Sequence, residues 1–279
     1  MKSRFYILTL AFALLTTQAL AQDIEYKLSY NVYAGGLKAL KATYAIQNTP
    51  STYQIDITAE TQGVIGKVFP WSATYKTTGI NSASGFIPEQ HASTSTWKDN
   101  EKIKDIQFTN GEVSKYSVTK EGKTHIAQNL KDDLISDAHD LLTAIASTFR
   151  SISLEEGCAS SAIAFDGKRK FKVTLNDGEE KTLSSSKYSS FSGQSVKCTL
   201  TVDPIAGFRE KDQKRGWMAV QNHTQDRGKL PAIWFGQLEE NGPYVPVRMQ
   251  IASDYGAVIA HLTDISIPSL NLLEAASGQ

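Results

Sequence analysis

The chain has 279 residues, of which 41% are hydrophobic, and its 29 basic and 29 acidic side chains give a formal net charge of zero. This length suits one large domain or two small ones and allows a substantial core. The balanced charge gives no electrostatic reason to expect nucleic acid, or an anionic membrane surface, as the partner of the whole protein.

Residues 1–21 have the three parts of a secretory signal peptide. Lys2 and Arg4 form a basic start, and residues 5–15 are almost all apolar. Ala19-Leu20-Ala21 then supplies the small residues that signal peptidase requires. We therefore expect residues 1–21 to direct export to the periplasm and to be removed there.

The mature chain, residues 22–279, is expected to be a single β-rich periplasmic domain without a membrane anchor. It contains no run of about 18 apolar residues, the length that a transmembrane helix needs. Gln22 follows the cleavage site, whereas a bacterial lipoprotein carries its lipid on a Cys at that position.

An alternation of apolar and polar residues predicts two blocks of strands, residues 24–119 and 160–267. The clearest alternating residues are Ile24, Tyr26, Leu28, Tyr30 and Val32, then Tyr53, Ile55 and Ile57, then Phe171, Val173 and Leu175, and later Val245, Val247, Met249 and Ile251. A period of two is typical of strands with one face on a core and the other in water. Breaks rich in Gly, Asn and Ser separate the runs, as turns require. We expect about a dozen strands.

Residues 136–150 have a helical period and join the two strand blocks. The apolar residues are Ala138, Leu141, Leu142, Ile145 and Phe149, which share one face of an α-helix. Ser136 is the expected N-cap, and Asp137 and Asp140 suit the positive end of the helix dipole. The sequence therefore predicts a mostly β fold, in which a curved or spiral antiparallel sheet (an open or half barrel) carries one amphipathic helix across it.

Cys158 and Cys198 are the only cysteines. An isolated pair in an oxidising compartment usually forms a disulfide. Closing this loop would contribute roughly 4 kcal/mol in the chain-entropy model. The alternatives are two free thiols or a metal site, but two cysteines without CxxC spacing make a poor zinc site. We predict a Cys158–Cys198 disulfide.

An ordered series of short motifs runs along the mature chain. The motifs are Gly35-Gly36, Val68-Phe69-Pro70-Trp71, Gly85-Phe86-Ile87-Pro88, Ile106-Gln107-Phe108, Asp132-Asp133-Leu134-Ile135-Ser136, Ala164-Phe165-Asp166-Gly167, Cys198, Ile205-Ala206-Gly207-Phe208, Ile233-Trp234-Phe235, Tyr244-Val245-Pro246-Val247-Arg248 and Gly256-Ala257-Val258 with Leu262. The series resembles the exported bacterial family of Domain of Unknown Function 3108, DUF3108. This resemblance implies a strongly curved or spiral sheet around a helix, similar to periplasmic lipoprotein-carrier half-barrels and to envelope-integrity β-spiral proteins. It implies no catalytic residues.

Two segments are candidate sites. Asp132, Asp133, Asp137, His139 and Asp140 have the ligand types of a hard-metal site, but acidic residues at a helix N-terminus are the simpler interpretation, and we expect no metal or cofactor.

The second segment is apolar on all sides and ends in Pro-Trp. Its residues Val64, Ile65, Val68, Phe69 and Trp71 form a candidate binding lip that touches lipid or a partner, with a strand bend that plugs the end of the core as the alternative. Trp97, Trp217 and Trp234 are interpreted as core anchors.

Motifs of catalysis are absent from the sequence. It contains no HExxH, GxSxG, GxGxxG or Walker motif, and the histidines are scattered. The charged runs at residues 168–170 and 209–215 are interpreted as solvated surface, since they lack the aromatic residues of a nucleic-acid platform.

These patterns predict a non-catalytic periplasmic protein that supports cell-envelope integrity. It would bind a lipid, a peptidoglycan fragment or an envelope protein in a concave apolar groove that the helix lines or plugs. One alternative is an envelope hydrolase whose acids, His or Ser converge in a pocket. Another is an outer-membrane β-barrel. The lipid-facing apolar band of such a barrel should recur in every strand, and the strands predicted here are too polar and uneven for that.

Overall fold

The computed structural model describes residues 24–152, 157–176, 178–240, 242–253 and 256–267. The predicted signal peptide lies outside these residues. The strands are β1 (Ile24–Ala34), β2 (Leu37–Asn48), β3 (Thr52–Thr61), β4 (Trp71–Ser82), β5 (Gly85–Trp97), β6 (Asn100–Thr109), β7 (Glu112–Lys120), β8 (Lys123–Ile126), β9 (His139–Asp140), β10 (Ser160–Phe165), β11 (Lys170–Asn176), β12 (Glu180–Leu183), β13 (Gly193–Ala206), β14 (Ala232–Gln237), β15 (Tyr244–Ser253) and β16 (Gly256–Ser266). The helices are α1 (Gly63–Val68), α2 (Asp132–Ile135), α3 (Leu141–Arg150), α4 (Glu210–Gln213) and α5 (Gly216–Gln225).

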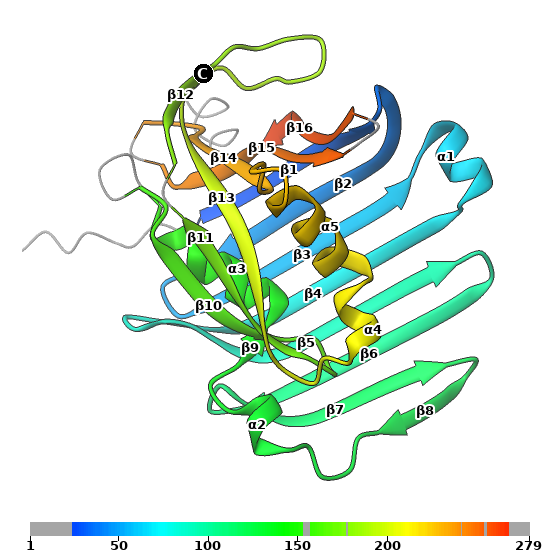
Figure 1. Ribbon diagram of the computed structural model, residues 1–279. Coiled ribbons are helices and arrows are strands. Elements are labelled where there is room, and N and C mark those ends of the chain that lie inside the picture. Colours follow the sequence, from blue (N-terminus) through cyan, green and yellow to red (C-terminus); the bar gives the residue numbers. More distant parts are fainter. Residues whose placement is uncertain (1–23, 153–156, 177, 241, 254–255, 268–279) are drawn as a thin grey trace, which may run out of the picture.

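All the described strands belong to one 16-stranded sheet, in the order β8-β7-β6-β5-β4-β3-β2-β1-β16-β15-β14-β13-β11-β10-β9, with β12 beside β13. The pairs are antiparallel except β9 with β10, which are parallel. Strands β1–β8 form a broad curved wall, β10–β13 fold across it, and α3 lies between them (Figure 1). This arrangement confirms the predicted mostly β, curved and open sheet with a helix across it.

Tight turns join most neighbouring strands of the wall. Asn110 and Gly111, between β6 and β7, both have positive φ, as do Glu121 and Gly122 between β7 and β8. These are the Asn-Gly and X-Gly pairs that type I′ turns favour. The turns keep successive strands adjacent, so the apolar residues of the alternating pattern lie on the same inner face in each strand.

The inner face of the wall is apolar near β1–β3. Across β2 and β3, Tyr44 lies opposite Ile57 and Ile46 opposite Ile55. Leu28 on β1 continues the Tyr44 row and is fully buried. Burial of such side chains is the main stabilising contribution to the fold.

The long helix begins later than the sequence predicted. It starts at Leu141, and Asp140 is its N-cap, with Oδ1 accepting from Leu142 N at 2.9 Å and Thr143 N at 3.1 Å. Ser136, the predicted N-cap, instead follows the C-terminus of α2. Asp137 has φ of 52°, which ends any helix at that point.

Two further features differ from the prediction. The sheet has more strands than the expected dozen, and α1, α2, α4 and α5 occur in addition to the one predicted helix. Among the described helices, none has the length and hydropathy needed to cross a bilayer.

The predicted disulfide is confirmed. Cys158 and Cys198 are bonded, with their Cα atoms 5.6 Å apart, and both are buried beside Ile152 and Phe235. The bond ties the segment after α3 to β13. It indicates an oxidising, extracytoplasmic compartment.

Candidate ligand-binding cavity

A cavity of about 580 Å³ lies inside the curve of the sheet. Its walls are the inner face of β1–β3, helix α3, strands β11 and β13, and α5. The lining residues are Tyr30, Val32, Ala42, Thr43, Tyr44, Ile55, Ile57, Leu141, Leu142, Ile145, Thr148, Phe149, Asp166, Arg169, Phe171, Val173, Leu175, Leu200, Val202, Phe208, Gly216, Trp217, Met218, Ile233, Pro246, Met249 and Ala260. The volume is within the range of small-molecule sites, roughly 300–1,000 Å³.

The sequence pattern explains why this space is apolar. On β2 and β3 the inward positions include Ala42, Tyr44, Ile55 and Ile57, and small Ala42 leaves room beside its larger neighbours. Residues of the predicted apolar stripe of α3, with Ile145 at its middle, form the opposite wall. The helix therefore lines the cavity, one of the two roles that the sequence predicted for it.

Helix α5 closes the cavity where β13 is no longer paired with β14. Strand β14 pairs with β13 only as far as Thr199. Beyond that point the Gln221 side chain takes the place of a strand: its Oε1 accepts from Val202 N at 2.6 Å and its Nε2 donates to Val202 O at 3.1 Å. Trp217 and Met218 are thereby held against the cavity.

Trp217 was predicted to be a core anchor, but it is half-buried and lines the cavity. Trp234 is buried in the core, as predicted. Trp97 is 45% exposed, so its predicted core role is wrong. It lies at the end of β5, where its ring is 6.1 Å from that of Phe69.

The tyrosines of the cavity wall remain uncharged. Burial raises the pKa of Tyr30 well above its ordinary value, and burial together with nearby Tyr26 also raises the pKa of Tyr44. The Tyr30 hydroxyl donates to Pro246 O at 2.8 Å, so it is already satisfied by the protein. These side chains present aromatic surface to the cavity.

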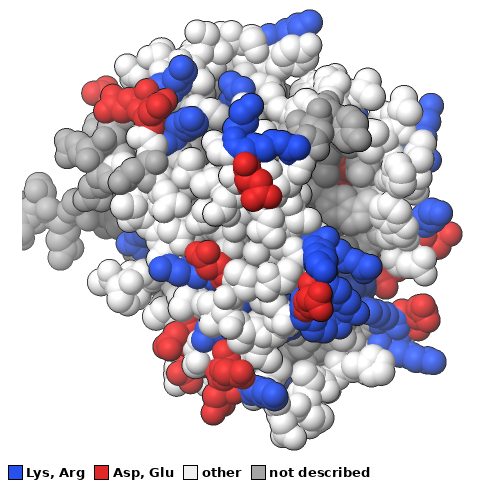
Figure 2. Space-filling model, viewed as in Figure 1, with Lys and Arg blue, Asp and Glu red and all other residues white. Residues whose placement is uncertain are grey.

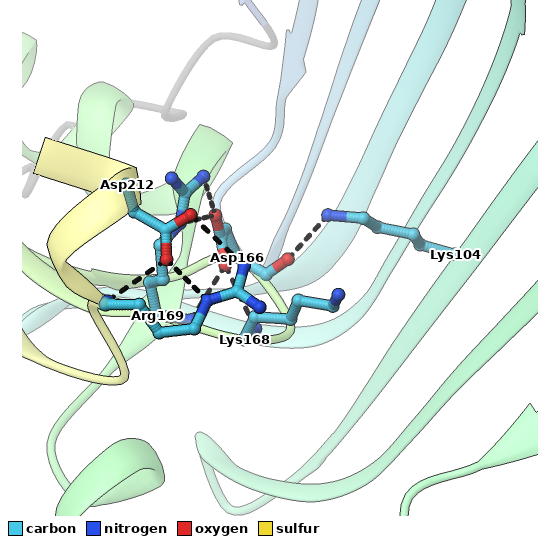
Figure 3. A network of polar contacts seen from close by, with 6 residues as sticks. Lys104, Asp166, Lys168, Arg169 and Asp212 are labelled. Carbon is cyan, nitrogen blue, oxygen red and sulfur yellow. Dashed lines mark hydrogen bonds and ion pairs between the residues drawn. The ribbon is translucent and has the colours of Figure 1, made fainter. Parts of the chain in front are cut away.

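The turn between β10 and β11 brings charge to the cavity wall. Among the described residues that line the cavity, Asp166 and Arg169 are the only charged ones. Asp166 Oδ1 accepts from Lys168 N and Arg169 N, and Oδ2 accepts from Arg169 Nε at 2.9 Å (Figure 3). Lys104 Nζ donates to Asp166 O at 2.7 Å, which joins β6 to this turn.

A second polar network, centred on Asp140, is fully buried. Asp140 Oδ1 accepts from Thr77 Oγ1 at 2.7 Å and is 3.2 Å from His91 Nδ1, while Oδ2 accepts from Thr143 Oγ1 at 2.5 Å. The Tyr53 hydroxyl completes the network on Thr143 Oγ1 at 2.7 Å. Burial alone would raise the pKa of Asp140, but His91, Thr143 and Thr77 outweigh burial and lower it.

The Asp140 network has the residue types of a hydrolytic triad but a different geometry. In a triad the nucleophile's proton goes to His and the acid orients the other ring nitrogen. Here Thr77 donates its only proton to Asp140, so it accepts from His91 Nδ1. Thr77 is also completely inaccessible to solvent. The geometry makes this network a structural support for the start of α3.

The acidic group at residues 132–140 does not converge. Asp132, Asp133 and Asp137 are exposed, whereas Asp140 points into the core. Within the described part of the chain, no group of three or more potential ligands could hold a metal ion. His139 is half-buried beside a more polar pocket of about 430 Å³, and burial lowers its pKa despite the nearby Asp140.

The predicted lip lies apart from the residues that line the cavity. Val64, Val68 and Phe69 on and beside α1 are more than half exposed, and Ile65 and Trp71 are half-buried. Their role in binding stays a prediction.

Two features were missed by sequence reasoning. The first is the charged run at residues 168–170, which follows Asp166 at the cavity end and which the sequence predicted to be solvated surface. Lys170 in this run is only 7% exposed, and its Nζ donates to Ser136 O at 2.6 Å. His91, one of the scattered histidines, lies against Asp140. Strand pairing, which cannot be read from the sequence, brings Lys170 to Ser136 and His91 to Asp140.

The fold and the cavity together define a β-rich protein whose single open sheet curls around an apolar interior. The family model described as "Protein of unknown function (DUF3108)" matches residues 26–263, and the chain belongs to this family. Among solved structures, the chain is similar to the "Beta-barrel-like Protein of Domain of Unknown Function DUF1849" from Brucella abortus. The two share 12% identity over 88% of this chain and 98% of that chain, with a TM-score of 0.46. Comparison with curated proteins gives no match.

Proposed function

We propose that this protein binds the apolar chain of a lipid or similar amphiphile in the cavity between the sheet, α3 and α5. It does so as a non-catalytic periplasmic protein, exported by a cleaved signal peptide over residues 1–21, and it supports the integrity of the cell envelope. The observation that carries the proposal is a cavity of about 580 Å³ whose described lining is mostly apolar and carries charge only at one turn.

The physical reason is the exchange of water for hydrocarbon. Each methylene group that leaves water for an apolar site contributes about 0.8 kcal/mol. Val173, Leu200 and Ile57 offer such a surface from three different strands. A peptidoglycan fragment would need hydrogen-bonding partners along its length, and this wall offers few. The cavity therefore favours a hydrocarbon chain among the ligands that the sequence left open.

The test is to fill the cavity from its small-residue side. Ala42→Trp places a large ring in the space, and Ala45→Trp is the matched control, because Ala45 on the same strand lies between Lys27 and Asp56 on the outer face. We expect the wild type and Ala45→Trp, purified without detergent from the producing envelope, to carry lipid in native mass spectrometry. Ala42→Trp should carry little or none.

The cellular arm of the test uses the same pair. A deletion strain should become sensitive to detergents, and Ala45→Trp should restore resistance while Ala42→Trp should not. Equal lipid content in the two variants, or a deletion strain with normal resistance, would count against the proposal. Osmotic-shock release and N-terminal sequencing test the periplasmic location and the cleavage site.

A further inference from the structure

Cations are in excess beside the charged end of the cavity, where Arg169 lines the wall and the lysines lie next to it. Strand register places Lys102 opposite Lys120, and Lys104 opposite Val118, on the same face of the sheet as buried Ile106. That face is the inner one. Lys102 and Lys104 therefore project into the curve of the sheet, toward the turn that carries Asp166.

The turn is packed directly against these strands. Gly167 has φ of 93°, and a Cβ atom there would overlap the ring of Tyr116 on β7. Lys104 Nζ reaches the backbone oxygen of Asp166. Lys168 and Arg169 follow in the same turn, so the cations of β6 and of the turn form one group beside the cavity (Figure 3).

We call this group the basic end of the cavity, and its members are Lys102, Lys104, Lys120, Lys168 and Arg169. The nearby acids do not neutralise its charge. Asp166 is engaged by Arg169 through an ion pair of 2.5 Å. Among the described residues, the four lysines have no acidic partner within ion-pair distance.

Burial is the largest influence on the pKa of Lys102 and of Lys104, and it lowers both. Neighbouring cations, Lys168 among them, lower both further, whereas Asp166 raises them.

Two other features border the basic end. On the facing α4 segment, Arg209 holds Asp212 through its own backbone and side chain and lowers the pKa of Asp212 to about 2, so this acid is also already paired. Figure 2 shows Lys and Arg side chains gathered around α4. The Tyr116 hydroxyl is buried beside Gly167 and has no hydrogen-bond partner in the described structure.

We propose that the basic end binds the anionic headgroup, phosphate or carboxylate, of an amphiphile whose hydrocarbon chain fills the cavity. This inference rests on the proposed function and adds the class of ligand. An anion at this point relieves the repulsion among the lysines, and its oxygens accept from Lys102 and Lys168. The apolar wall, with Phe171 and Phe208 nearest the turn, takes the first part of the chain.

The experiment compares headgroups on one chain. Calorimetric titrations of the mature protein below the micelle concentration would use dodecyl phosphate, dodecyl maltoside, dodecyltrimethylammonium and inorganic phosphate. We expect dodecyl phosphate to bind about tenfold tighter than dodecyl maltoside at low ionic strength, and the preference to shrink as salt screens the charges. Dodecyltrimethylammonium should bind most weakly of the three chains.

The variant K102Q/K104Q/K168Q should lose the preference for phosphate and keep affinity for the maltoside. The control K27Q/K41Q/K115Q removes the same charge from exposed outer-face positions and should keep the preference. Because Lys104 also bonds to the turn, Lys168→Gln alone serves as a second variant, with an expected loss of two- to fivefold.

The possible failures are distinguishable. If the maltoside and the phosphate bind equally, the headgroup inference is wrong and the proposed function stands. If none of the three chains binds, both are wrong. If inorganic phosphate binds as tightly as dodecyl phosphate, the basic end is a site for free phosphate and not for an amphiphile.

Discussion

Two aspartates, Asp140 and Asp166, each organise a polar network inside the sheet, and the networks differ in balance. Asp140 is fully buried: Thr77 and Leu142 donate to Oδ1, Thr143 donates to Oδ2, and His91 Nδ1 lies 3.2 Å from Oδ1. Asp166 is partly exposed and lies among more cations than it can neutralise. The first network is complete within the protein, whereas the second leaves positive charge unmatched.

This difference in charge balance indicates that the Asp140 network supports the fold, whereas the surroundings of Asp166 are suited to binding a ligand. A buried polar group without partners costs roughly 1–3 kcal/mol, so a network inside a core has to be closed. A network at the edge of a cavity tolerates unmatched charge because water or a ligand completes it. Removing Asp140 should therefore affect folding first, and altering the surroundings of Asp166 should affect binding first.

The largest expected effect is that of Asp140→Ala. It removes the N-cap of α3, leaves Thr77 and Thr143 without their common acceptor, and removes the carboxylate that lies 3.2 Å from His91 Nδ1. We expect a loss of about 3–5 kcal/mol in the free energy of unfolding, measured by urea denaturation. Asp140→Asn, which keeps one carbonyl acceptor at the cap, is the control and should lose less. A loss below about 1 kcal/mol for Asp140→Ala would break the contrast between the networks.

Thr77→Val should have an intermediate effect. The substitution keeps the shape of the side chain but removes a donor to Asp140 and the acceptor of His91 Nδ1. The expected loss is about 1–3 kcal/mol, with no change in the affinity for dodecyl maltoside. Thr74→Val, on the outer face of the same strand and exposed, should be close to neutral. Equal effects of the two substitutions would show that the network does not support the fold.

The decrease in the free energy of unfolding at low pH tests the state of Asp140. Its pKa is lower in the folded protein, so its contribution to stability is fully present above the unfolded value of about 3.9 and is lost as the pH falls through the folded pKa. Urea unfolding between pH 7 and pH 3 should therefore show a difference between wild type and Asp140→Asn that narrows in acid. A constant difference over this range would contradict the lowered pKa.

Asp166→Asn should have the smallest effect on stability and an opposite effect on binding. The pair with Arg169 is partly exposed, so its loss should cost about 0–1 kcal/mol of unfolding free energy. The same change removes a negative charge beside the basic end and should tighten dodecyl phosphate binding severalfold. Weaker binding of dodecyl phosphate would show instead that Asp166 positions Arg169 for the ligand.

The sequence was sufficient for the fold class, which depends on local patterns, and for the disulfide, because the chain contains just two cysteines. Alternation along β1, β3 and β11 is visible without any partner strand. The start of α3 was not predictable in the same way. Ser136 and Asp140 are both good caps, and the choice depends on Thr77, 63 residues away, which donates to Asp140.

The site was predictable only in part. The apolar stripe of α3 and the inward residues of β3 are local patterns, and both line the cavity. The basic end was not visible, because Lys102 on β6 and Lys168 in the β10–β11 turn meet only after the sheet curls. In the sequence they are ordinary surface charges.

The most direct test of the central claim is the dependence of affinity on chain length. Octyl, decyl and dodecyl maltoside share one uncharged headgroup, so the increment between them measures the cavity alone. If the chain enters the cavity, each added methylene should tighten binding about fourfold, and Ala42→Trp should abolish the increment. Affinity that does not change with chain length, or that is the same in Ala42→Trp, would contradict the account.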